Sequence, residues 1–148
     1  MYNSQLGVNE RGGNNRGPEV KLYLASVNLG EGYAWCGAFA NWVMQQCGQP
    51  APTAAAMAMA WFPRSHTVWR RDQPPKHTPQ RADLFGLYYA SLRRIGHVGF
   101  IDNWDAASGY AITVEGNTNE AGSREGDGVY RKRRLIRQIY AVSDWVTP

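Results

Sequence analysis

Apolar residues in the first part of the chain recur at helical spacing. They stand three and four positions apart, the spacing of one helical face, at Val20, Tyr23, Leu24 and Val27. Pro18 precedes this pattern, and proline suits the first position of a helix. Gly30 follows it and favours a stop. We therefore predict a first helix between residues 18 and 30.

A second helix is predicted from residue 36 onward. Apolar residues follow Cys36 at i+3, i+4, i+7 and i+11, at Phe39, Ala40, Val43 and Cys47. Gly48 and the two nearby prolines end the pattern. Cys36 then lies on the first turn and points toward packed protein, and Cys47 is expected to be a small core residue. About 16 Å of helix would separate the two sulfurs, which is too far for a disulfide.

The pattern changes after residue 81 to short β-branched and aromatic runs. We predict strands at residues 82–87, 97–103, 110–115, 129–133 and 138–142. Before them, residues 54–61 favour one short helix and residues 73–79 a loop. Helices followed by strands indicate an α+β fold, with N-terminal helices packed on a five- to six-stranded antiparallel sheet. Residues 116–128 are expected to form a long surface loop that could contact substrate.

Length and charge narrow the picture further. A chain of 148 residues with 43% hydrophobic content suits one core, so residues 1–148 are predicted to be a single catalytic domain. The net charge of +4 fits attraction to an anionic envelope, and it fits nucleic acid or simple solubility equally well. The densest basic run, residues 131–134, is expected to face solvent, because no nucleic-acid recognition motif accompanies it.

The candidate chemistry begins with Cys36. A thiol on the first helical turn lies near unpaired backbone N–H groups and the positive end of the helix dipole, and both favour the thiolate. His97 opens an apolar run, so a strand could present it to the sulfur as a base. Glu115 and Asn117 stand two residues apart at the end of the next run, and either could orient the imidazole.

Three segments resemble the signature blocks of CHAP domains, the cysteine, histidine-dependent amidohydrolase/peptidases of the NlpC/P60 superfamily. They are Trp35-Cys36-Gly37-Ala38-Phe39, Arg94-Ile95-Gly96-His97-Val98-Gly99-Phe100 and Val114-Glu115-Gly116-Asn117-Thr118. The resemblance implies a papain-like fold and cleavage of amide bonds in bacterial cell-wall peptide. It also implies that Cys36 is the nucleophile, His97 the base, Glu115 its orienter and Asn117 an accessory polar group.

Two features of the family pattern bear on this chain. Residues 81–84 read Arg-Ala-Asp-Leu where the family usually has Gly-Asp followed by an aliphatic residue, so only a local turn differs. The aspartate-rich loop with which some relatives bind calcium is not visible, so neither a metal nor another cofactor is implied.

The main functional hypothesis is a cysteine amidase or endopeptidase that cuts the stem peptide or cross-bridge of peptidoglycan through a thioacyl-enzyme. It would serve as a phage-type lysin or as a secreted antibacterial effector. Two alternatives stay open: the same fold acting on a non-wall amide or thioester, and a catalytically silent module that binds the cell wall.

Partners and location follow from this hypothesis. Peptidoglycan is the expected partner, and no binding of nucleic acid is expected. An effector would have a cognate inhibitor or immunity protein. The protein itself is expected to be a monomer. Residues 1–18 are polar and no apolar stretch approaches the length of a membrane span. We therefore expect synthesis in the cytoplasm and action in the periplasm or at the cell wall, after delivery by lysis or by a secretion system.

Overall fold

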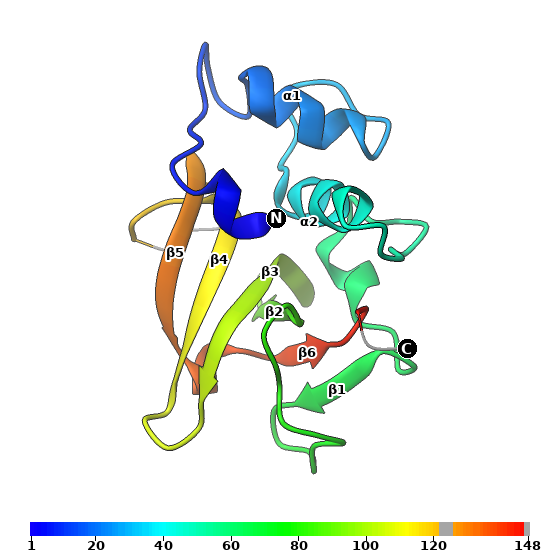
Figure 1. Ribbon diagram of the computed structural model, residues 1–148, viewed down its shortest axis with the longest axis vertical. Helices are drawn as coiled ribbons and strands as arrows, with labels where there is room; N and C mark the ends of the chain where they lie inside the picture. Colours follow the sequence, from blue (N-terminus) through cyan, green and yellow to red (C-terminus); the bar gives the residue numbers. More distant parts are fainter. Residues whose placement is uncertain (122–125, 147–148) are drawn as a thin grey trace.

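The chain folds as helices packed at one end of a curved antiparallel sheet, in the computed structural model of residues 1–121 and 126–146 (Figure 1). The helices are α1 (Pro18–Ala25) and α2 (Cys36–Gln46), with 3-10 turns η1 (Tyr2–Gln5), η2 (Ala58–Trp61) and η3 (Ile136–Gln138). The strands are β1 (Thr67–Arg70), β2 (Leu84–Tyr89), β3 (Arg94–Asp105), β4 (Tyr110–Thr118), β5 (Gly128–Leu135) and β6 (Ala141–Ser143). They form one six-stranded sheet in the order β1-β6-β2-β3-β4-β5. The predicted α+β, papain-like class is confirmed.

Helix α2 packs closely against strand β4 on one side and against the backbone of residues 55–56 on another. A Cβ on Gly116 of β4 would stand 2.7 Å from the ring of Phe39, so this glycine lets the helix approach the sheet. A Cβ on Gly37 would stand 2.5 Å from the carbonyl oxygen of Ala55, so the segment before η2 lies against the first turn. The start of α2, which carries Cys36, is therefore held between β4 and the 55–56 backbone.

An aromatic cluster joins α1 to α2. Tyr23 of α1 contacts three rings, with centroid distances of 5.6 Å to Trp35, 5.3 Å to Phe39 and 5.2 Å to Trp42. Trp35 is fully buried, and its indole N–H donates to Glu10 at 2.8 Å. The residue directly before Cys36 is thus fixed both by packing and by the N-terminal segment.

The N-terminal segment is itself fastened to the sheet. Its backbone pairs with the start of β5, where the N–H of Gly7 donates to Val129 at 3.2 Å and the N–H of Val129 donates to Val8 at 2.8 Å. Nearer the terminus, the ring of Tyr2 stacks on Phe100 at 4.8 Å.

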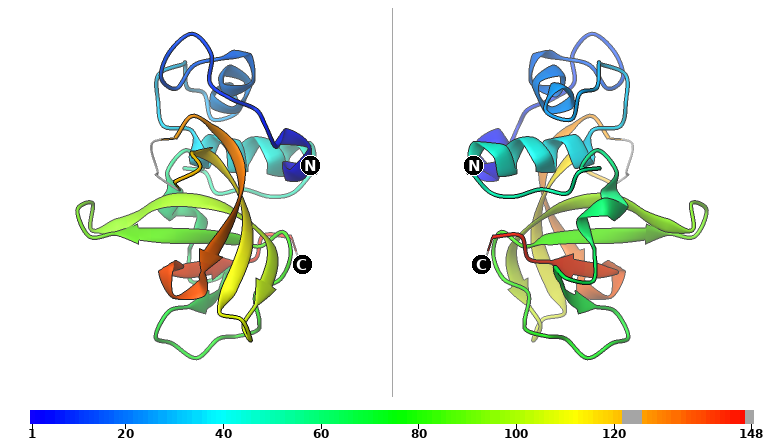
Figure 2. Two further views of the ribbon diagram at one scale, coloured as in Figure 1. Left: turned by 90° about the vertical axis from the view of Figure 1, so that its left-hand side faces the viewer. Right: turned by 90° about the vertical axis from the view of Figure 1, so that its right-hand side faces the viewer.

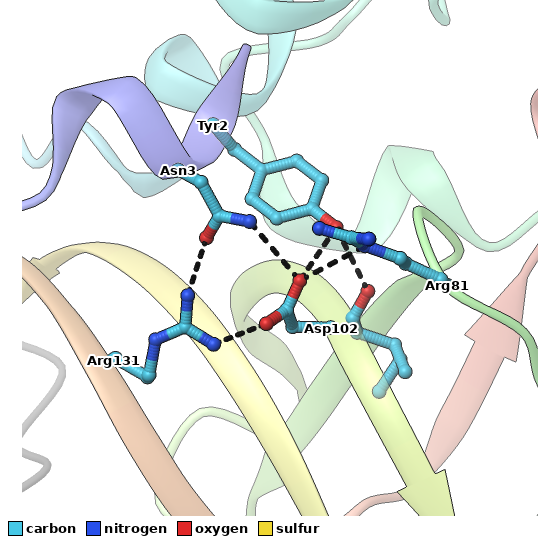
Figure 3. Close-up of polar contacts among 6 residues, drawn as sticks. Tyr2, Asn3, Arg81, Asp102 and Arg131 are labelled. Carbon is cyan, nitrogen blue, oxygen red and sulfur yellow. Dashed lines mark hydrogen bonds and ion pairs between the residues drawn. The ribbon is translucent and has the colours of Figure 1, made fainter.

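The carboxylate of Asp102 on β3 binds several polar side chains near the N-terminus (Figure 3). Tyr2, Asn3 and Arg81 each donate to it at 3.1 Å, and Arg131 of β5 pairs with it as well. Asp102 therefore links η1 to two strands and to the segment before β2.

Several predicted elements differ from the observed ones. The first helix ends at Ala25 rather than near Gly30, and a turn with a positive φ of 60° at Asn28 follows. Residues 54–56 form a turn and residue 57 a bend, and only Ala58–Trp61 is helical, as a 3-10 turn. Strand β1 was not predicted. The predicted strand at residues 138–142 is split between η3 and β6.

Two further expectations change. Cys47 caps the end of α2 and is exposed, so the prediction of a core residue was wrong. The expected loop at residues 116–128 begins later, because β4 continues to Thr118; residues 122–125 of that loop lie outside the described part of the chain. Among the helices that the structure describes, none has the length and apolar character needed to cross a membrane.

Candidate active site

Cys36 is the first residue of α2 and is almost buried, with 7% of its surface exposed. The preceding residue, Trp35, provides no side-chain cap. The backbone N–H groups of the first turn therefore have no intrahelical acceptors and face the region around the sulfur. Such groups suit a thiolate and the oxyanion that forms when a thiolate attacks a carbonyl.

The environment of Cys36 favours ionisation. Burial raises the pKa of the thiol, but His97 beside it outweighs that effect, with further help from the backbone N–H groups of Val98 and Gly37. The net pKa lies below the ordinary value of a cysteine. A thiolate is the nucleophilic form of the side chain, so this cysteine is chemically activated.

His97 stands on β3 with no exposed surface. Its Nε2 pairs with Oε2 of Glu115 at 2.8 Å. Its Nδ1 makes no regular hydrogen bond with any residue in the described ranges, which leaves this nitrogen for the thiol. Cys36 is near enough to raise the pKa of His97, and a hydrogen bond of this kind often tightens only when substrate binds.

Burial alone would lower the pKa of His97. The neighbouring Cys36 and the carboxylate of Glu115 oppose burial and raise that pKa to about 9. The opposite directions of the two shifts favour a thiolate and an imidazolium side by side near neutral pH.

A β-bulge sets the direction of the imidazole. Leu87 of β2 pairs with His97 and Tyr88 pairs with Ile95, so Gly96 is an extra residue in β3. A bulge bends its strand and re-aims the next side chains. A Cβ at this position would stand 2.8 Å from the side chains of Leu92 and Tyr89, so these side chains pack closely over Gly96.

Glu115 on β4 is the most heavily bonded side chain of the site. Besides His97, it accepts from the hydroxyl of Thr113 at 2.5 Å and from Arg134 of β5 through Nε at 2.5 Å and Nη2 at 2.6 Å. Burial would raise the pKa of this carboxyl, but Arg134 and His97 hold it at about 2. Glu115 therefore stays ionised and is fixed in position.

Arg134 is the site residue that the sequence did not reveal. We expected residues 131–134 to face solvent, and Arg131 and Arg133 are indeed exposed. The side chain of Arg134, in contrast, is only 11% exposed and pairs with Glu115. The alternation of side chains along a strand could have revealed Arg134, because it places residues 132 and 134 on the opposite face from residues 131 and 133.

Asn117 follows Glu115 by two residues but makes no hydrogen bond to His97. It adopts a left-handed backbone with φ of 55°, and its side chain is buried. Within the described part of the chain, neither polar atom of its amide has a hydrogen-bond partner. Of the two predicted orienting residues, the structure brings Glu115 and not Asn117 to the imidazole.

The same environment makes a prediction that needs no substrate. Near neutral pH, iodoacetamide should alkylate Cys36 at least about tenfold faster in the native protein than in His97→Ala, because the lowered thiol pKa depends on the imidazole. The measurement is peptide mapping by mass spectrometry over a range of pH. Exposed Cys47 is the internal standard, and its labelling should not change between the two proteins. Equal labelling of Cys36 in both would contradict the coupling.

The residues of the described ranges contain no group of three or more His, Cys, Asp or Glu side chains arranged to hold a metal ion.

Comparison with known proteins agrees with this geometry. No curated protein and no solved structure matches the chain. The family model of the CHAP domain matches residues 28–117, a range that includes Cys36, His97, Glu115 and Asn117. This family suggests amidase or peptidase activity on peptidoglycan. With more than half of its length matched, the chain belongs to the CHAP domain family.

Proposed function

We propose that the protein is a cysteine amidase or endopeptidase that hydrolyses an amide bond of peptidoglycan, in the stem peptide or its cross-bridge, through a thioacyl-enzyme. The observation that carries this proposal is the buried chain from Arg134 through Glu115 and His97 to Cys36 at an uncapped helix start. Family membership supports the substrate class.

Acylation follows from the ionised pair. The Cys36 thiolate attacks the carbonyl carbon, a C–S bond forms, and backbone N–H groups at the start of α2 stabilise the oxyanion. The imidazolium of His97 then gives its proton to the amide nitrogen. The C–N bond breaks, the amine leaves, and a thioester and a neutral imidazole remain.

Deacylation restores the starting state. Neutral His97 takes a proton from a water molecule while the water oxygen attacks the thioester carbonyl. The new intermediate collapses, the C–S bond breaks, and the carboxylic acid product leaves. Cys36 is again a thiolate, and the proton taken from water remains on His97 as the imidazolium.

Glu115 takes no proton in this cycle. Its low pKa keeps it charged, so it stabilises the imidazolium and fixes the ring with Nδ1 directed away from the carboxylate. Arg134 and Thr113 position Glu115. Asn117 stays an accessory polar group in this proposal, since it makes no hydrogen bond to the ring.

We also propose that the protein acts in the periplasm or at the cell wall, after delivery by lysis or by a secretion system. The net charge of +4 supports attraction to an anionic envelope. If the protein is an antibacterial effector, a cognate inhibitor should cover the surface around Cys36.

The proposed activity is tested on purified sacculi. The native protein should release new amine and carboxyl termini, identified by mass spectrometry of the soluble fragments. Cys36→Ala and His97→Ala should each lower the rate by about a thousandfold or more, because each removes a reacting group. Cys47→Ala is the matched control and should retain the native rate. Full activity in Cys36→Ala would end the proposal.

Arg134 offers a second test, of positioning rather than reaction. Arg134→Gln should lower kcat by about 10- to 100-fold with little change in KM, since the guanidinium holds Glu115 and touches no substrate. Arg134→Lys keeps the charge without the bidentate geometry and should be intermediate. Arg133→Gln, on the exposed face of β5, should behave as the native protein. A native kcat in Arg134→Gln would contradict the positioning role.

A further inference from the structure

A pocket of about 240 Å³ lies among η2, β1, β2, β3 and β6. Three arginines line it, Arg70, Arg93 and Arg94, together with the rings of Tyr88 and Tyr140. No acidic side chain is among its lining residues. In the part of the chain that the structure describes, no carboxylate forms an ion pair with any of these three arginines. The pocket therefore concentrates positive charge that the protein itself does not neutralise.

One of these cations is held in place. The guanidinium of Arg70 donates to the hydroxyl of Tyr140 at 2.8 Å and lies 4.9 Å from the centre of that ring. The ring of Tyr88 lies 5.0 Å from the same tyrosine and is partly exposed. A guanidinium that is already oriented loses less entropy when it binds an anion, so this arrangement is prepared for a ligand.

The other two arginines come from the β2–β3 hairpin, which projects from the body of the molecule (Figure 2). Arg93 stands in its turn with a positive φ of 52°, and Arg94 begins β3. The pocket is thus lined partly by the sheet and partly by the projecting β2–β3 hairpin, so a peptide could enter between them.

The pocket and His97 share strand β3. Ile95 lines the pocket and stands two residues before His97, and the bulge at Gly96 turns the two side chains to opposite faces of the strand. Phe62 also lines the pocket and follows η2, whose preceding segment packs on Gly37 beside Cys36. Two residues of chain span at most about 7 Å, so an extended substrate reaches from His97 to the pocket with a residue about two positions from the scissile amide.

We propose that this pocket is the subsite that binds a free carboxylate of the substrate peptide, about two residues from the bond that Cys36 attacks. The inference rests on the proposed function and adds the chemical group that selects the substrate. Arginine matches a carboxylate through two parallel hydrogen bonds. The volume accommodates one amino-acid residue rather than a long polymer, which favours a peptide carboxylate over a nucleic acid.

The test compares soluble wall stem peptides in which each free carboxylate is replaced in turn by a carboxamide. The native protein should cleave one carboxylate peptide with a kcat/KM roughly tenfold or more above that of its carboxamide partner. Arg70→Gln and Arg94→Gln should each reduce this preference through a higher KM, with kcat and the rate on the carboxamide peptide unchanged. Arg133→Gln, an exposed arginine on β5, should keep the full preference.

Binding to the inactive Cys36→Ala variant separates the two proposals. Calorimetry with the same peptide pair should show tighter binding of the carboxylate form, and Arg70→Gln in that background should remove the difference. Equal cleavage and equal binding of both forms would overturn the subsite while leaving the hydrolase intact. Carboxylate-selective binding with no cleavage by the native protein would support the subsite and count against the hydrolase. Arginine-dependent binding of a DNA oligonucleotide, without any effect of the variants on peptides, would also overturn the subsite.

Discussion

The buried negative charge of Glu115 is the constraint on which the site depends. An ionised carboxylate without exposed surface is strongly destabilising unless charges and hydrogen bonds compensate it. Here His97, Thr113 and Arg134 supply that compensation from three adjacent strands, β3, β4 and β5. The same interactions that make the charge tolerable also fix the imidazole, so stability and alignment have one origin.

The sulfur is positioned by a different set of forces. Close packing at Gly37 and Gly116 sets the distance of α2 from its neighbours, and the buried ring of Trp35, bonded to Glu10, fixes the residue before Cys36. The pair of Cys36 and His97 therefore joins two separately packed parts of the molecule, a helix start and a sheet. Packing of this kind holds reacting groups in place before substrate binds, which is what the proposed hydrolase requires.

The sequence predicted those features that repeat locally. The helix from Cys36 and most of the strands follow from periodicity, and the apolar runs placed His97 and Glu115 at strand positions. The features that depend on distant partners were not predictable in this way. Strand β1 is only four residues long and is paired with β6 at the far end of the chain. Arg134 looks like its neighbours until the register of β4 and β5 places it beside Glu115.

Other differences between prediction and structure have local causes. Cys47 continues the apolar period of α2, but it falls at the helix end, where it is exposed. Glu115 and Asn117 stand on one strand two residues apart, so sequence could not choose between them. The left-handed backbone at Asn117 breaks the alternation there, and only Glu115 reaches the ring.

The most direct measurement of the central claim is the protonation of His97 by ¹⁵N nuclear magnetic resonance near neutral pH. The thiolate–imidazolium pair requires both ring nitrogens to carry protons in the native protein. Cys36→Ser removes the thiolate, so the imidazole should then lose its second proton at a lower pH. A neutral imidazole in the native protein, or an identical titration in both proteins, would contradict the account.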